Sequence, residues 1–302
     1  MKTKIISIAL AVAVMLSAVA LLSGCSDGEY PVEVANLKIE SKPENIVVLD
    51  APTADILIAT GYDRYIVGRS DEVDQKSVEV APSMGSSEKP DADKIVEAGA
   101  DLVFAGPTID ESVKKKLSDK GIQVIKMSHG DTPKQVETNY ITISKICGGT
   151  KTGAKNGENT YNDLLDKMNN YKQQVNSINS GILDTVCYLY TEDDQLRIMS
   201  NGTYGDMLLG YTGAVNVAVN ITDNAVDVAT LRVANPNFVF YADDATLKKI
   251  KSDATLAGLG AVKNGKILEV SIEEMSRPGD TSLEALEKMV YFMYPDLKPK
   301  SA

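Results

Sequence analysis

The stretch that decides the organisation of this chain is KTGAKNGENTYNDLLDKMNNYKQQVNSINS, residues 151–180. Apolar side chains recur along it at helical spacing, at Tyr161, Leu164, Leu165, Met168, Tyr171, Val175 and Ile178. This spacing gathers them on one side of a helix, while the residues between them are mostly polar. No strand-like run interrupts the stretch. It therefore predicts one long helix that joins the two parts of the chain without belonging to the core of either.

Before this helix, short apolar runs alternate with amphipathic stretches. Strands are expected at 45–50, 65–68, 101–106 and 123–128. Helices are expected at 53–60, 91–98, 109–120 and 133–147, with Thr53 and Asp91 as caps. The strands are nearly continuous runs of apolar, often β-branched residues. Such runs are typical of parallel strands that are buried on both faces.

After the helix, the same alternation resumes. Strands are expected at 185–190, 215–219, 238–241 and 267–270, and helices at 204–209, 227–233, 244–251 and 282–291. The chain is therefore predicted to be α/β, with two Rossmann-like lobes of parallel sheet, 45–150 and 181–302, joined by the α-helix 151–180. Parallel sheets bind ligands at the carboxyl ends of their strands, so the cleft between the lobes is the expected site.

Residues 1–24 have the pattern of a secretory signal, because Lys2 and Lys4 precede an apolar run that ends in Leu22-Ser23-Gly24-Cys25. The pattern resembles a bacterial lipoprotein signal, which implies that Cys25 becomes the mature N-terminus and carries a lipid. An uncleaved membrane anchor is the alternative. Residues 25–44 are expected to form the lipid-anchored tether. Both readings place the protein at the extracytoplasmic face of the cell membrane.

The composition excludes several kinds of partner. The formal net charge is −11, whereas binding of nucleic acid requires clustered Lys and Arg. Cys147 and Cys187 fall in different predicted lobes, so two buried thiols are favoured over a disulfide. No Cys or His has zinc-site spacing, and neither a resident metal nor a cofactor is expected. The chain is expected to be a monomer.

No catalytic motif fits the chain. Residues 24–28 match the pattern G-x-S-x-G, but this match crosses the predicted cleavage site and has no strand before it. His129 is the only histidine, which leaves few ways to build a Ser-His-Asp triad. An exported hydrolase is therefore a distant alternative. An adhesive surface protein is another, and the buried parallel-strand runs argue against it.

Several short segments are similar, in order and spacing, to those of a known family. They are Gly61 followed by Ile66-Val67-Gly68, then Ala100-Asp101-Leu102-Val103, Ala214-Val215-Asn216, Asn235-Pro236-Asn237-Phe238, the segment 256–267, and Arg277-Pro278-Gly279. Together with the long central helix, they resemble the helix-hinged solute-binding proteins of ABC importers for ferric siderophores, haem and corrinoids. The resemblance runs from about residue 46 to 296. It implies a permease partner, a metal-chelate ligand and little lobe closure.

The ligand-binding residues are expected on the loops that follow the strands. The candidates are Thr53, Arg69, Met84, Thr108, Asn201, Tyr204, Tyr241 and Arg277. Arg277 suits an anionic ligand group, and its alternative role is an ion pair with Glu273 or Glu274. If the chelate were haem, its axial ligand would be His129, Met84 or a Tyr, and the alternative for His129 is an ordinary polar loop residue.

The resemblance also implies that one acidic residue of each lobe docks the permease, seven residues before the Pro of a Pro-Asp pattern. Ala100 stands at that Pro position in the first lobe, which selects Asp93. Pro236 selects Ala229 in the second lobe, so the nearby Asp227 is the candidate there.

The ligand itself is less well defined. An iron siderophore is the first expectation, because siderophore binders are frequent in this family. However, siderophores are often anionic, and Arg69 and Arg277 are the only arginines expected in the cleft. A corrinoid or haem therefore remains an alternative.

Overall fold

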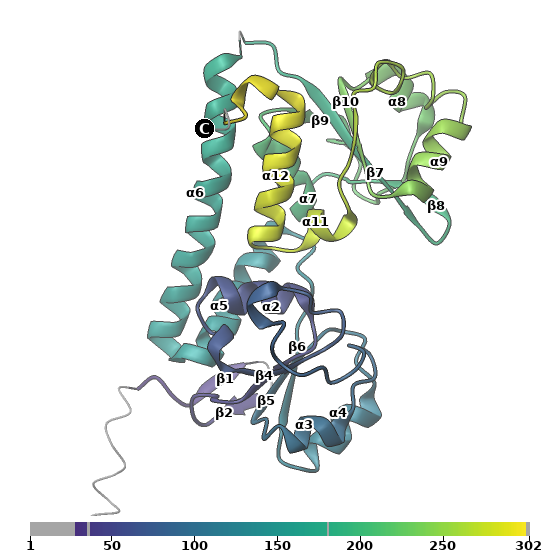
Figure 1. The fold of residues 1–302 in the computed structure, drawn as a ribbon. Coiled ribbons are helices and arrows are strands. Elements are labelled where there is room, and N and C mark those ends of the chain that lie inside the picture. Colours follow the sequence, from purple (N-terminus) through teal and green to yellow (C-terminus); the bar gives the residue numbers. More distant parts are fainter. Residues whose placement is uncertain (1–27, 35–36, 180, 300–302) are drawn as a thin grey trace, which may run out of the picture.

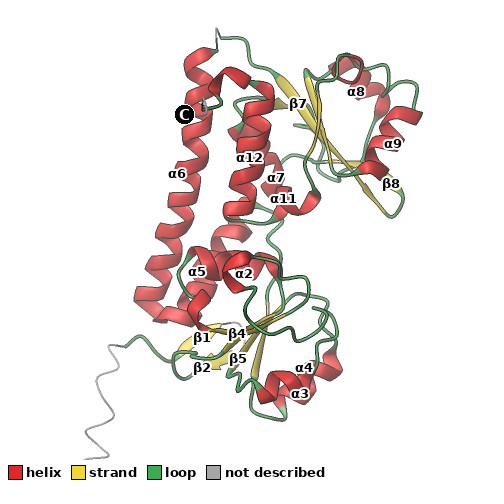
Figure 2. Ribbon diagram, in the orientation of Figure 1, coloured by secondary structure: helices red, strands yellow, loops and turns green. Residues whose placement is uncertain are grey.

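The computed structural model describes residues 28–34, 37–179 and 181–299. Two α/β lobes lie one above the other, and the helix α6 runs along one side of both (Figure 1). Each lobe has its own sheet, as the strands in Figure 2 show. The predicted α/β fold, with two lobes of parallel sheet joined by a long helix, is confirmed.

The N-terminal lobe is built on a parallel sheet with the strand order β4-β3-β5-β6. Its strands are β3 (Ile46–Val48), β4 (Ile66–Arg69), β5 (Leu102–Ala105) and β6 (Gln123–Lys126). Its helices are α2 (Ala51–Ala59), α3 (Ala92–Glu97), α4 (Glu111–Ser118) and α5 (Pro133–Gly148). Val47 and Val103 share a core cluster with α3 and α4, and Val48 and Phe104 share another with α2 and α5. Helices on both faces explain why these strands are apolar throughout.

The C-terminal lobe has the strand order β11-β10-β7-β8, and β9 also pairs with β7. Its strands are β7 (Thr185–Glu192), β8 (Gln195–Ile198), β9 (Val215–Asn216), β10 (Phe238–Tyr241) and β11 (Ile267–Glu269). Its helices are α7 (Tyr204–Tyr211), α8 (Val228–Ala234), α9 (Asp244–Ser252), α10 (Gly260–Lys263), α11 (Ile272–Ser276) and α12 (Asp280–Met293). Leu231, Ile250 and Ala261 cover one face of this sheet from α8, α9 and α10.

The strand β8 was not expected from the sequence. It is antiparallel to β7, and Asp193 and Asp194 form the turn between the two strands with φ values of 48° and 58°. A two-residue hairpin turn of this kind requires positive φ at both positions, where Gly or Asn is usual. Asp tolerates the left-handed region, but two consecutive Asp residues are a weak turn signal.

The connecting helix α6 (Ala154–Ile178) lies within the predicted range 151–180. With 25 residues it is about 38 Å long. Its buried side chains Tyr161, Leu164, Met168 and Val175 belong to one core cluster that also contains Ile46 of the first lobe and Tyr188 of the second. The prediction that this helix stands outside both cores is therefore wrong. An apolar stripe of this length needs a partner surface in each lobe, and both supply one.

A tight corner joins α5 to α6 through the π-helical turn Gly149–Gly153. A Cβ atom on Gly157 would overlap the carbonyl oxygen of Tyr140, so the two helices touch through their backbones at this point. Short 3-10 turns lie at Asp63–Tyr65, Lys76–Val78 and Pro295–Leu297.

The region expected to be a tether is partly folded. The strands β1 (Val32–Val34) and β2 (Leu37–Ile39) form an antiparallel hairpin, and Val32 and Ile39 are buried. Tyr30 Oη donates a hydrogen bond of 2.9 Å to the carbonyl oxygen of Ile146. The tether prediction is thus wrong for the described residues between 28 and 44, because these apolar side chains have a place on the first lobe. Cys25 lies outside the described residues.

Cys147 and Cys187 are both buried and free, as expected. Burial raises the pKa of each thiol, which keeps it protonated and unreactive at neutral pH. Among the helices of the described ranges, none combines the length and the apolar character required to cross a membrane.

Candidate functional site

A buried carboxylate stands at the carboxyl edge of the first sheet, where β3 leads into α2. Asp50 caps α2, and its Oδ2 accepts hydrogen bonds from the backbone N (3.0 Å) and the hydroxyl (2.6 Å) of Thr53. The cap predicted at Thr53 therefore lies three residues earlier, and the helix begins at Ala51. Thr53 is 2% exposed and its hydroxyl donates to Asp50, so it holds the Asp50 carboxylate in place at the edge of the sheet and is not free to contact a ligand.

His129 lies beside this carboxylate, with its Nε2 3.1 Å from Asp50 Oδ1. The imidazole is 54% exposed, whereas the Asp50 side chain is 5% exposed. Gly106, at the end of β5, leaves room for the pair, because a Cβ there would lie 3.1 Å from Asp50 Oδ1. The hydrogen bond with Asp50 raises the pKa of His129, although partial burial opposes the shift; the charges of Asp50 and Asp131 add to it. The pair presents a fixed imidazole to solvent at the edge where ligands are expected.

Arg277 joins the two lobes. It follows α11, and its Nε and Nη2 donate hydrogen bonds of 2.8 and 3.1 Å to the carboxylate of Asp55 on α2. Its Nη1 donates a further one of 2.9 Å to Asp74. The side chains of Arg277 and Asp55 are only 11% and 6% exposed, while that of Asp74 is 70% exposed. The forked guanidinium thus bridges the C-terminal lobe to two carboxylates of the N-terminal lobe.

The electrostatics of this bridge follow from its burial. Burial raises the pKa of Asp55, and the hydrogen bonds from Arg277 and Gln75 act against that rise. Burial also disfavours the charged form of Arg277, but the bonds to Asp55 and Asp74 raise its pKa above the ordinary value. Each member of the pair thus opposes the effect of burial on the other through direct hydrogen bonds. The carboxylates of Glu273 and Glu274 form no ion pair with Arg277, whose backbone N donates instead to the carbonyl oxygen of Glu273 at 2.9 Å, so the alternative role of Arg277 as their ion-pair partner is wrong.

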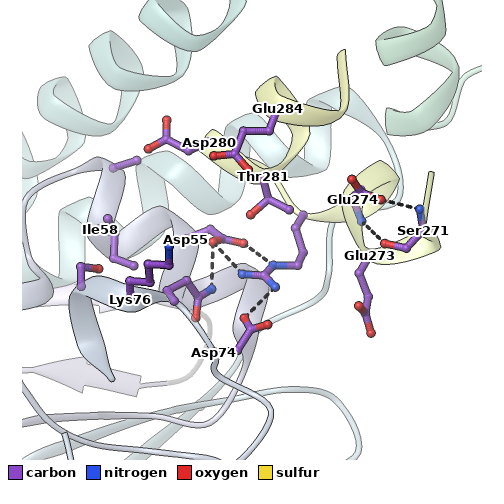
Figure 3. A pocket seen from close by; sticks show the side chains of 14 residues that line it. Asp55, Ile58, Asp74, Lys76, Ser271, Glu273, Glu274, Asp280, Thr281 and Glu284 are labelled. Carbon is purple, nitrogen blue, oxygen red and sulfur yellow. Dashed lines mark hydrogen bonds and ion pairs between the residues drawn. The ribbon is translucent and has the colours of Figure 1, made fainter. Parts of the chain in front are cut away.

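A cavity of about 560 Å³ lies beside the bridge and is lined by both lobes (Figure 3). The N-terminal lobe contributes α2 and the segment 74–77, and the C-terminal lobe contributes α11 and the first turns of α12. Asp55 and Arg277 stand in its wall, where Figure 3 shows Asp74 on the other side of the guanidinium. We call this space the interlobe cavity.

Three of the predicted ligand residues are held inside the protein. Met84 is 2% exposed and packs against Gly68 in the core of the first lobe. Tyr204 is 2% exposed, and its hydroxyl lies 2.9 Å from Ser282 Oγ. Tyr241 is 9% exposed at the end of β10. None of the three lines the interlobe cavity. Tyr204 instead joins the lobes, because its backbone N donates to the carbonyl oxygen of Asp131 at 2.7 Å.

The other predicted ligand residues lie on loops. Thr108 and Asn201 are exposed, each close after a strand of its own lobe. Arg69 is half-buried, and its Nη1 donates to the carbonyl oxygens of Ser70 (3.0 Å) and Val73 (2.9 Å). Its guanidinium is therefore already engaged in holding the loop after β4. Of the eight candidates, only Arg277 lines the interlobe cavity.

The two docking candidates are exposed and belong to different lobes. Asp93 lies in the first turn of α3 and pairs with Lys116 at 2.8 Å. Asp227 caps α8, and its carboxylate accepts hydrogen bonds from the backbone N of Ala229 (2.9 Å) and from Thr230.

Three carboxylates of the site, those of Asp50, Asp55 and Asp74, were not predicted from the sequence. Asp50 had a readable signal, because it follows a buried strand and precedes Ala51-Pro52, a helix start with Pro in its first turn. Asp55 and Asp74 had none, since their partner Arg277 is 222 and 203 residues away in the chain.

We expect Arg277→Ala to lower the free energy of unfolding by about 3–5 kcal/mol, because it leaves the Asp55 carboxylate buried without a cationic partner and with only the amide of Gln75 as a donor. The matched variant Asp74→Asn removes the exposed arm of the bridge and should cost less than about 1 kcal/mol. Urea denaturation of both proteins measures the difference. Equal and small effects of the two variants would show that the buried arm does not stabilise the fold.

A second prediction concerns pH. Since the pKa of His129 is raised in the folded state above its ordinary value of 6.5, the pair with Asp50 stabilises the fold fully below that value. This contribution is lost as the pH rises through the raised pKa of the folded state. We expect a loss of roughly 0.3–1 kcal/mol, because solvent screens the half-exposed imidazole.

The measurement is the free energy of unfolding between pH 6 and 9, roughly the interval in which histidine titrates. His129→Gln should flatten the curve, since the chain has no other histidine. Parallel curves for the two proteins would contradict the role of the pair.

The comparisons with known proteins agree with this architecture. The family model described as "Periplasmic binding protein" matches residues 46–271. The chain is 21% identical over 308 residues to the uncharacterized ABC transporter substrate-binding lipoprotein YvrC of Bacillus subtilis, covering 94% of this chain and 96% of that protein. It is 22% identical to the petrobactin-binding protein YclQ of the same organism, covering 96% of each.

Solved structures show the same fold at low identity. A periplasmic heme binding protein from Pseudomonas aeruginosa has a TM-score of 0.66 and 20% identity, covering 86% of this chain and 96% of that one. The periplasmic vitamin B12 binding protein BtuF of Vibrio cholerae has a TM-score of 0.58 and 18% identity, covering 85% and 99%. Because the family model matches well over half of the residues, this chain belongs to the periplasmic binding protein family, whose members bind solutes for transport and are not enzymes.

Proposed function

We propose that this chain is the extracytoplasmic substrate-binding lipoprotein of an ABC importer and that it takes a metal chelate between its lobes. The observation that carries the proposal is the interlobe cavity, whose wall is built from α2 of one lobe and from α11 and α12 of the other. Its volume of about 560 Å³ lies in the range of small-molecule sites, roughly 300–1,000 Å³. Membership of the periplasmic binding protein family supports transport as the purpose.

The names of related proteins support a chelate as the ligand. Petrobactin, heme and vitamin B12 are the ligands named for the relatives above. An iron siderophore is the first candidate for this chain, and a corrinoid or haem is the alternative. Thr108 and Asn201 do not line the interlobe cavity, but both are exposed close after strands and are available as polar contacts to a part of a bulky ligand that extends beyond it. His129 is the candidate axial ligand for haem, because its imidazole is exposed and held by Asp50.

Docking to the permease is assigned to Asp93 and Asp227. One exposed carboxylate on each lobe would let a membrane partner grip both lobes at once through basic residues. Asp93 would have to exchange its partner Lys116, which is a small cost for an exposed ion pair. Asp227 would dock while it still caps α8, because a carboxylate accepts several hydrogen bonds.

The proposed anchor is a lipid on Cys25, which would hold a monomer at the outer face of the cell membrane. We expect Cys25→Ala to release unprocessed or soluble protein, because the variant has no thiol to acylate. Labelling with radioactive fatty acid and fractionation of the membranes measure the effect, with Cys147→Ala as the control that keeps its lipid. Unchanged labelling and retention of Cys25→Ala would contradict the anchor.

The test of the whole proposal is a titration of the purified protein with three coloured chelates: a ferric siderophore, a corrinoid and haem. Saturable binding of at least one, without turnover, is the expected result. Bound ligand should also raise the melting temperature, because it stabilises only the folded state. If none of the three binds in absorbance and thermal-shift experiments, the proposal is overturned.

A further inference from the structure

The interlobe cavity is lined by more acidic than basic residues. Its lining contains six carboxylates, from Asp55, Asp74, Glu273, Glu274, Asp280 and Glu284. It contains two cations, Lys76 and Arg277. Counted at formal charge, the six acids and two bases leave the cavity at −4.

One of the two cations, Arg277, already forms ion pairs within the protein. All three donor nitrogens of Arg277 that form ion pairs point to Asp55 and Asp74, at 2.8–3.1 Å. Arg69, on the same lobe, is likewise engaged with two backbone carbonyl oxygens. Lys76 is exposed and remains the one lining cation, within the described part of the chain, for which no ion pair is found. A bound anion would therefore meet one mobile ammonium and several carboxylates.

Two of the acids are exposed toward the cavity from the C-terminal lobe. Glu273 lies on α11 and Glu284 on α12, and their side chains make no hydrogen bond within the described residues. Figure 3 shows both at the side of the cavity opposite α2. Carboxylates that pair with no cation leave their charge uncompensated, and a cleft with protein walls concentrates the field of such charges.

We infer that the interlobe cavity selects its ligand by charge, so that it accepts a cationic or neutral chelate and rejects a polyanionic one. The inference rests on the proposed function and narrows its ligand class. It favours hydroxamate-type iron chelates and corrinoids over tris-catecholate chelates and over haem, whose propionates are negative. A polyanion would lose its hydration and gain only the ammonium of Lys76 as a free cationic partner, and like charges across an interface oppose binding.

The acidic lining of the cavity does not form a binding site for a bare metal ion. No group of three or more His, Cys, Asp or Glu residues is placed to hold a metal ion within the residues that the structure describes. No three of the six carboxylates are therefore close enough together to hold one ion. This arrangement suits a bulky ligand with spread positive charge.

The experiment measures dissociation constants by calorimetry for ferrioxamine B and aquocobinamide, which are cationic, and for ferric enterobactin and haem, which are anionic. We expect the better cationic chelate to bind at least tenfold more tightly than either anionic one, about 1.4 kcal/mol. Added salt should weaken the binding of the cationic chelate, because salt screens exposed charges.

Two double variants test the cause. Glu273→Gln with Glu284→Gln removes two charges from the cavity, and the cation-to-anion ratio of affinities should fall at least threefold. Glu33→Gln with Glu97→Gln removes the same net charge from exposed residues outside the cavity lining and should leave the ratio unchanged.

The outcomes separate the two proposals. Tightest binding of an anionic chelate by the unaltered protein would overturn charge selection and leave the carrier function standing. An equal change of the ratio in both double variants would also overturn it, because total charge would then be the cause. Binding of none of the four chelates would overturn the carrier function itself.

Discussion

The structure depends on the apolar face of α6, which is shared by both lobes. Tyr161, Met168 and Val175 are part of one core cluster that extends from the first sheet to the second. An exposed stripe of this length would be unfavourable in water, at about 25 cal/mol for each Å² of apolar surface. The helix is therefore a structural part of each lobe as well as the link between them. This arrangement fixes the two sheet edges at one distance and creates the space where the ligand is proposed to lie.

The ion pairs of Arg277 with Asp55 and Asp74 connect the two lobes in addition to this shared core. Arg277 and Asp55 are buried far from each other in sequence but in direct contact in space. A buried ion pair adds little net stability compared with apolar packing, yet it is costly to separate. Its main effect is therefore on geometry, because any rotation that opens the lobes at this point must separate a forked pair. Such a bridge agrees with a carrier in which the lobes move little.

Most of the fold was predictable from the sequence because its strands are buried on both faces. Runs such as 102–105 and 238–241 are apolar at every position, and the structure has strands at both. The antiparallel β8 and the hairpin β1–β2 were not predictable in the same way, since short edge strands depend on a turn or a docking surface. The π-helical turn before α6 also has no sequence pattern of its own.

The site was less predictable, and the reason is physical. Position at the end of a strand indicates the region of a side chain but not its direction, so Met84, Tyr204 and Tyr241 turned out to be buried. The role of Arg277 is set by carboxylates from the other lobe, and no local pattern records that contact.

The shared core has a further consequence for any attempt to divide the protein. A fragment that ends with α6 would expose the half of the stripe that α7 and α12 cover, and a fragment that begins with β7 would expose their matching surfaces. Each fragment alone would expose an apolar patch and would be prone to aggregate. When the two fragments are mixed, their apolar surfaces are complementary and should bind each other. The whole protein should therefore unfold as one cooperative unit, and neither lobe should be stable alone.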